Sequence, residues 1–172
     1  MKRTLWILML LLAVSANATV FKNGPVTDFV QSGQPISRVI PPDGAYGISA
    51  DHRFRDSVAE DFTVTHGGWT VQRISLYVYV PNQPNLPVSQ LQLWIRAGLD
   101  PNAGATVYIT DRNVTSGVFV GYRVHAGNLS DTTRAMYRID VDIPNQYLAP
   151  GGYTLHWSFT PTINAPPSSP ST

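Results

Sequence analysis

Most of the chain after residue 69 alternates between apolar and polar positions with a period of two. Between Ile74 and Val80 every second residue is aliphatic, and serine and tyrosine occupy the positions between them. Strict alternation is typical of a β-strand with one buried face and one wet face. The same pattern, or a run of β-branched and aromatic residues, predicts further strands at 91–95, 105–110, 118–124, 135–143 and 153–159. Beyond the first eighteen residues, no stretch spaces its apolar residues as a helix does over three turns.

The last of these strands has two clearly different faces. The odd positions from Tyr153 to Phe159 are all aromatic or aliphatic, and we expect them to point inward from one central strand. His156 lies on the opposite face, so we expect it outside the core or at a sheet edge.

Turn residues separate the predicted strands. Examples are His66-Gly67-Gly68 and Pro150-Gly151-Gly152, and such clusters mark tight turns. Short strands joined by polar turns predict an all-β fold, which we interpret as a single antiparallel β-sandwich of jelly-roll-like architecture.

Both ends of this domain are less regular. The Gly- and Pro-rich stretch 19–57 predicts a lead-in with one or two edge strands. The last residues, 164–172, are Pro, Ser and Ala without periodicity and predict a tail or a truncated end. We therefore place the domain at 19–163. The lead-in is expected to close against the core through Phe29, Val39, Ile40 and Tyr46.

The first eighteen residues have the features of a cleavable signal peptide. Lys2 and Arg3 precede the unbroken apolar run Leu5–Val14, which is shorter than the about 20 residues that span a bilayer. Ala16-Asn17-Ala18 is a small-x-small cleavage pattern, with cleavage expected before Thr19. The sequence thus predicts a secreted or cell-surface protein whose mature chain has no transmembrane segment; an uncleaved anchor is the alternative.

The composition limits the kinds of partner that the protein can bind and indicates what stabilises its fold. The chain has no cysteine, so a secreted domain of this kind depends on its hydrophobic core and not on disulfides. Loss of Lys2 and Arg3 leaves 10 basic against 11 acidic residues, a net charge near −1, and the basic residues are scattered. Nothing in this pattern favours binding to nucleic acid or to an anionic membrane.

The sequence offers no catalytic set. Glu60 is the only glutamate, and its neighbour Asp61 points to the opposite face of a strand, so the two cannot flank one bond. Asp140 and Asp142 share a face, but Arg138 beside them favours a solvated charged stripe over a carboxylate pair. Phosphate-loop and serine-hydrolase motifs are also missing. We therefore predict no catalytic residues and a protein that is not an enzyme.

A cofactor is not predicted either. The four histidines, His52, His66, His125 and His156, lie on separate elements and form no zinc motif. A structural calcium ion is kept as an alternative because loop aspartates supply the hard oxygen ligands that it prefers. The aspartates considered are Asp51, Asp56, Asp61, Asp100 and Asp111.

Aromatic residues on the wet faces are the candidate binding residues. Tyr77, Tyr79 and Trp94 lie opposite the aliphatic positions of their strands. Planar rings on an outer β face can stack on sugar rings or contact another protein. The alternative is that Trp94 fills a second layer of the sandwich or lies under the lead-in.

With these strands placed, the chain resembles a family of secreted bacterial β-sandwich proteins, many of which bear a C-terminal sorting signal of the PEP-CTERM-like kind. The resemblance implies an exported β-sandwich and supplies no catalytic residues. Thr154 departs from the family pattern, which often has a tryptophan there. The segments that carry the resemblance are Asn23-Gly24-Pro25, Val58–Val64, Gly67–Val71, Leu91–Ile95 and Leu148–Leu155.

These features together predict a non-catalytic secreted or surface domain that acts in binding or adhesion. Extracellular glycans or a surface protein are the expected partners. Two alternatives remain open, a purely structural module of a surface protein and an extracellular hydrolase whose carboxylates converge from distant loops.

Overall fold

A computed structural model describes residues 27–39, 47–162 and 168–169 of the chain. The predicted signal peptide, the Asn23-Gly24-Pro25 segment, Ile40 and Tyr46 all lie outside the described residues. Within the described ranges, no helix has the length and apolar character needed to cross a membrane.

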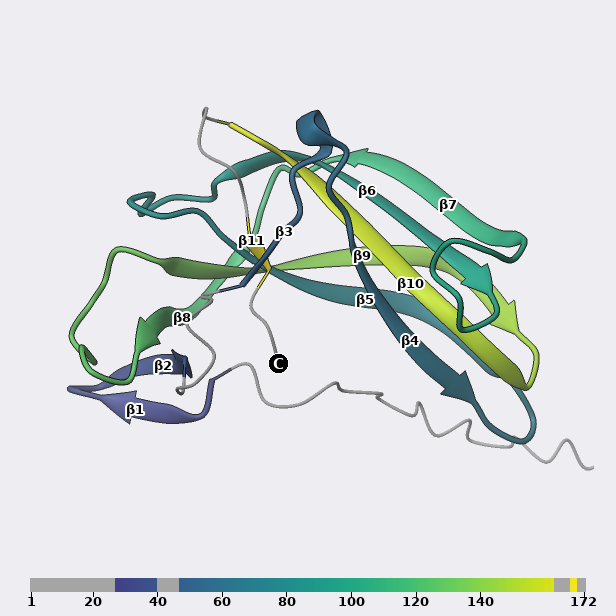
Figure 1. Cartoon of the computed structure of the whole chain (residues 1–172), viewed down its shortest axis with the longest axis horizontal. Coiled ribbons are helices and arrows are strands. Elements are labelled where there is room, and N and C mark those ends of the chain that lie inside the picture. The colour runs from purple at the N-terminus through teal and green to yellow at the C-terminus, as the bar shows by residue number, and fades with distance from the viewer. Residues whose placement is uncertain (1–26, 40–46, 163–167, 170–172) are drawn as a thin grey trace, which may run out of the picture.

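Two β-sheets make up the fold (Figure 1). Sheet A has seven strands in the order β1-β2-β8-β9-β5-β11-β3, and sheet B has four in the order β4-β10-β6-β7. The strands are β1 (Phe29–Gln31), β2 (Gln34–Val39), β3 (Ile48–Ser49), β4 (Val58–Val64), β5 (Trp69–Tyr79), β6 (Val88–Ala97), β7 (Thr106–Asn113), β8 (Val118–His125), β9 (Ala135–Leu148), β10 (Gly151–Pro161) and β11 (Ser168–Ser169). One 3₁₀ turn, η1 (His52–Phe54), precedes β4.

The predicted all-β sandwich is confirmed. Each stretch predicted as a strand lies within a strand of the structure or overlaps one, and most strands extend further than predicted. The pairs are antiparallel except that β2 runs parallel to β8. That parallel pair attaches the N-terminal hairpin to sheet A, and the pattern of apolar residues gave no indication of it.

The core lies between the two sheets. Its main cluster joins Leu76 and Val78 of β5 and Ile139 of β9 to Leu93 of β6 and Phe159 of β10. These are the aliphatic and aromatic faces on which the period-two pattern was recognised. A second cluster near the start of β10 stacks the Phe62 ring between Trp69 and Tyr153, with centroid distances of 5.9 and 5.7 Å.

Strand β10 is buried on both faces, which corrects the expectation for His156. The odd positions face the core as predicted: Tyr153 and Phe159 are buried, and Trp157 packs against the core cluster. His156 does lie on the outer face, but it is only 5% exposed and occupies an interior strand rather than a sheet edge. Its ring stacks against Trp94 of β6, which lies directly opposite and shields it from solvent.

The irregular ends contribute more to sheet A than their composition indicates. Val39 is buried as predicted, but Phe29 is 41% exposed and does not close the core. Ser168 and Ser169, within the stretch predicted as a tail, form β11 and pair with β5 and β3. The Trp157 indole also donates a hydrogen bond to the Ser169 hydroxyl at 2.9 Å. A two-residue strand is held by backbone hydrogen bonds, so its residue types give little basis for predicting it.

Sheet A is wider than sheet B, and this difference shapes the molecule. The core clusters draw on β5 and β9 from sheet A, and neither cluster includes a described residue of β1 or β2. Figure 1 shows β1 and β2 to one side, away from the strands of sheet B. The inner face of β2 and β1 therefore extends past the edge of sheet B, whereas Tyr122 of β8 still packs against the main core cluster.

Candidate functional site

A β-bulge in β8 places two aromatic rings on the inner face of sheet A, beside the edge of sheet B. Phe119 is paired with Tyr137 and Gly121 with Met136, so Val120 is the extra residue. Without the bulge, Phe119 and Tyr122 would point to opposite faces because they are three positions apart. With it, both point to the inner face of sheet A.

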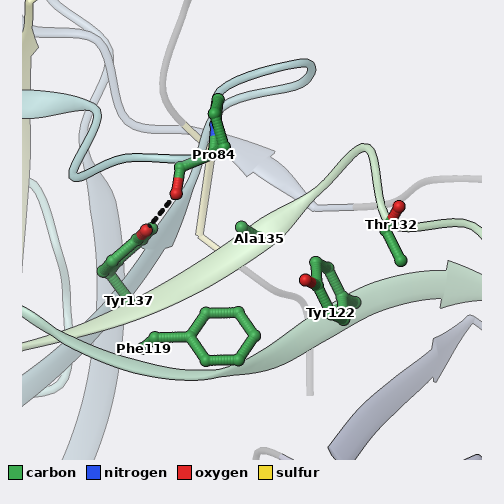
Figure 2. A pocket seen from close by; sticks show the side chains of 6 residues that line it. All are labelled: Pro84, Phe119, Tyr122, Thr132, Ala135 and Tyr137. Carbon is green, nitrogen blue, oxygen red and sulfur yellow. Dashed lines mark hydrogen bonds between the residues drawn. The ribbon is translucent and has the colours of Figure 1, made fainter. Parts of the chain in front are cut away.

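The two rings line an open hollow of about 320 Å³ (Figure 2). Figure 2 shows Phe119 and Tyr122 on one strand and Ala135 and Tyr137 on the next. The hollow is lined by Pro84, Phe119, Tyr122, Thr132, Ala135 and Tyr137. Its size falls at the lower end of the range typical of small-ligand sites, about 300–1,000 Å³.

The three aromatic rings hold one another in edge-to-face contacts. Phe119 meets Tyr122 at a centroid distance of 5.1 Å and an interplanar angle of 65°, and it meets Tyr137 at 6.1 Å and 68°. Such contacts favour a fixed arrangement of the rings. Phe119 nevertheless remains 40% exposed, so an apolar ring is held in place and presented to solvent.

Tyr137 connects the hollow to the loop between β5 and β6. Its hydroxyl donates a hydrogen bond to the carbonyl oxygen of Pro84 (Figure 2). Burial raises the pKa of Tyr137, with a smaller contribution from Tyr122, so the phenol stays protonated at neutral pH. The hollow thus offers neutral hydroxyl groups beside apolar rings.

A second hollow of about 140 Å³ adjoins the first and shares Tyr122 and Thr132 with it. We call it the polar hollow because six of its nine described lining residues are glutamine, serine, threonine or aspartate, although most of its exposed surface is apolar. Its lining residues are Gln31, Ser32, Gln34, Ile36, Tyr122, Leu129, Ser130, Asp131 and Thr132. The two hollows lie next to each other over β9, β8, β2 and β1. We call the two together the inner-face groove.

The carboxylate at the rim of this groove is already neutralised. One oxygen of Asp131 accepts hydrogen bonds from the Thr133 amide at 2.9 Å and the Thr133 hydroxyl at 2.6 Å. The other oxygen pairs with the Arg134 guanidinium at 2.6 Å. These contacts, led by the Thr133 hydroxyl, lower the pKa of Asp131. The groove therefore suits a neutral ligand better than a charged one.

The aromatic residues predicted from the sequence do not line the groove. Tyr77 is half-buried on the outer face of sheet A. Tyr79, expected on a wet face, is only 3% exposed, and its hydroxyl lies against the backbone at Gly47. Trp94 is half-buried on the outer face of sheet B, against His156. The structure therefore does not bring these three residues together.

The acidic stripe on β9 is held in ion pairs. Asp142 pairs with Arg73 at 2.8 Å, and Asp140 pairs with Arg138 at 3.1 Å. Asp140 also accepts a hydrogen bond from the Ser75 hydroxyl at 2.6 Å. This arrangement matches the solvated charged stripe that the sequence predicted.

The aspartates considered for calcium are spread over the fold. In the described part of the chain, no three histidine, aspartate or glutamate residues come together as a metal site. Four of the aspartates accept hydrogen bonds: Asp51 from Arg53, Asp56 from Ser49, Asp100 from the Asn102 amide and Asp111 from Gln92.

A cluster of buried polar atoms lies around Trp94 on the outer face of sheet B. The Trp94 and His156 rings stack with a centroid distance of 5.2 Å and an interplanar angle of 10°. Four buried side-chain atoms of this face lack a hydrogen-bond partner in the described part of the chain: Trp94 Nε1, Arg96 Nε, His156 Nε2 and Ser158 Oγ. Unpaired buried polar atoms are costly, so this face is a weak point in the stability of the fold.

We expect His156 to make the protein less stable in mild acid. Burial lowers the pKa of His156, and the positive charge of Arg96 lowers it further. The folded state therefore binds a proton less readily than the unfolded state, in which the pKa is about 6.5. The stability that neutral His156 contributes is therefore fully present above about pH 6.5, and it is lost as the pH falls below that value. Urea unfolding at about pH 7.5 and about pH 5.5 measures the loss. This loss of unfolding free energy should be smaller in His156→Gln and unchanged in the exposed control His66→Gln. An equal loss in the two variants would show that His156 is not responsible.

The sequence contained one sign of the groove that the alternation pattern concealed. An isolated glycine within a strand pattern often marks a bulge or a close backbone approach, and Gly121 marks both. The inward positions of Phe119 and Tyr122 follow from that bulge. The width of sheet A, which leaves Phe119 partly exposed, depends on long-range pairing that no local pattern predicts.

Comparisons with known proteins add little. No family model matches the chain, and no curated protein matches it. A solved structure described as that of the infectious bursal disease virus Gx strain is similar at 16% identity, with a TM-score of 0.20. The match covers 89% of this chain, which spans 40% of the viral chain. A similarity this low carries no argument about function.

Proposed function

We propose that the protein is a non-catalytic binding module, exported to the cell surface or medium, that holds neutral glycans in the inner-face groove. The observation that carries the proposal is the aromatic hollow on the inner face of sheet A, beside the edge of sheet B. Export is supported by the signal-peptide features of residues 1–18. The resemblance to secreted bacterial sandwich proteins points the same way.

The chemistry of the hollow suits a sugar ring. A pyranose has an apolar face of C–H groups, which can stack on an aromatic ring, and hydroxyl groups around its edge. Phe119 and Tyr122 supply exposed or half-buried rings, and the hydroxyl groups of Tyr122 and Thr132 line the same space. Asp131 is the one charged residue among the described lining residues of the two hollows, and it is paired with Arg134. A neutral ligand therefore does not have to desolvate a free ion there.

The lining also favours binding over reaction. Among the residues that the structure describes, those lining the aromatic hollow include no carboxylate, histidine or lysine. Acid–base chemistry usually needs two titratable groups with separated pKa values in one pocket. The described lining provides phenol groups, one threonine hydroxyl and apolar surface. Such groups can orient a ligand, but they do not activate it for reaction.

A glycan array probed with the purified chain tests the proposal. We expect binding to neutral glycans, and we expect Phe119→Ala to weaken it by about tenfold or more, as loss of a central aromatic contact does. Phe54→Ala is the matched control because Phe54 is 67% exposed and lies in η1, away from the groove. Thermal unfolding of both variants verifies that they are folded. An array without neutral-glycan signals, or equal losses in the two variants, would contradict the proposal.

A further inference from the structure

The hairpin of β1 and β2 presents two amide side chains at one end of the inner-face groove. Gln31 and Gln34 are paired directly across the hairpin, so their side chains point to the same face. The two residues between them, Ser32 and Gly33, both have positive φ, at 49° and 79°. That is the geometry of a tight two-residue turn whose twist matches the strands, so the positions of the two glutamines are well defined.

The amides lie on the same side of sheet A as the aromatic rings. Ile36 is two positions from Gln34 on β2 and pairs with Tyr122 of β8. Gln31, Gln34, Ile36 and Tyr122 all line the polar hollow. Aromatic and amide groups therefore form one continuous surface.

Both amides are available for a ligand. Among the described residues, neither the Gln31 nor the Gln34 side chain takes part in a hydrogen bond. Each amide offers a carbonyl acceptor and two N–H donors. Two such groups side by side suit neighbouring hydroxyl groups, which both donate and accept. By contrast, the carboxylate of Asp131, which lines the same hollow, is occupied by Thr133 and Arg134.

The groove is longer than one sugar ring. From β9 to β1 it crosses three inter-strand spacings, about 14 Å at the usual strand separation. Its aromatic part and polar part adjoin at Tyr122 and Thr132, which line both.

We propose that the groove binds a neutral oligosaccharide through at least two linked sugar units. One unit stacks in the aromatic hollow on Phe119 and Tyr122. The next unit lies in the polar hollow, where Gln31 and Gln34 bind its hydroxyl groups. This inference rests on the proposed glycan-binding function and adds chain length and a second subsite to it.

Titration calorimetry with saccharides of increasing length tests the inference. The probes are glucose, cellobiose and cellotriose, together with the mono-, di- and trisaccharide of the neutral sugar that binds best on the array. We expect the disaccharide of the preferred series to bind at least about tenfold more tightly than the monosaccharide, a modest gain for a second set of hydrogen bonds.

The double variant Gln31→Ala/Gln34→Ala should lose this gain, so that it binds the disaccharide and the monosaccharide with similar affinity. Gln90→Ala, an exposed glutamine on β6, is the matched control and should behave like the parent. Monosaccharide binding with no gain from chain length would overturn the second subsite and leave the proposed function in place. A gain that survives in the double variant would overturn the assignment to the two glutamines. Absence of binding to every probe by the parent would overturn the proposed function itself.

Discussion

Phe159→Ala is expected to lower the free energy of unfolding by about 3–5 kcal/mol. Phe159 is fully buried in the main core cluster, on the interior strand β10 and opposite Leu91 of β6. Its removal costs the transfer free energy of the ring and leaves a cavity, because neighbours held in two hydrogen-bonded sheets cannot close around it.

Urea unfolding of three phenylalanine-to-alanine variants provides the measurement. Phe119 is 40% exposed and Phe54 is 67% exposed, so replacing either by alanine should lower the free energy of unfolding by about 1 kcal/mol or less. If Phe119→Ala destabilises the protein as much as Phe159→Ala, Phe119 is a core residue, and the aromatic hollow is not a free surface.

The second large effect is expected from Gly121→Ala, at about 3 kcal/mol of lost stability. Gly121 has a φ of +140°, and a Cβ there would lie 2.3 Å from the carbonyl oxygen of Pro35 on β2. That contact is with backbone, so a side-chain rotation cannot relieve it, and β2 would have to move away from β8. The same movement would separate the glutamine hairpin from Tyr122 and divide the groove.

Gly33→Ala is the control for Gly121→Ala. Gly33 also has a positive φ, at +79°, but a Cβ there would meet nothing within 4 Å. Backbone strain alone should then cost about 1 kcal/mol. Equal destabilisation by the two variants, measured by urea unfolding, would show that the close approach of β2 and β8 at Gly121 is unimportant.

The sequence predicted the sandwich well because most strands have one wet face. The alternation in 74–80 and 135–143 located β5 and β9 and the sides on which they meet the core. The same pattern was wrong about the exposure of His156. A large side chain on the neighbouring strand, Trp94, covers the outer face of β10 there.

The candidate site was less predictable than the fold. The alternation of apolar and polar positions predicts exposed aromatic residues at Tyr77, Tyr79 and Trp94. The aromatic hollow depends instead on a bulge at Val120, which reverses the face of Phe119 relative to the pattern. It also depends on the attachment of β2 to β8 in parallel, a contact between residues about 86 positions apart.

The groove is tested most directly by mapping a bound glycan on the protein. The measurement is a two-dimensional ¹H–¹⁵N NMR titration of the purified chain with the neutral disaccharide that binds best. The account predicts shifts that saturate with ligand and are concentrated on residues 31–36, 119–122 and 131–137. Shifts concentrated around Trp94 and His156 on the outer face of sheet B would contradict it, as would a spectrum that does not change.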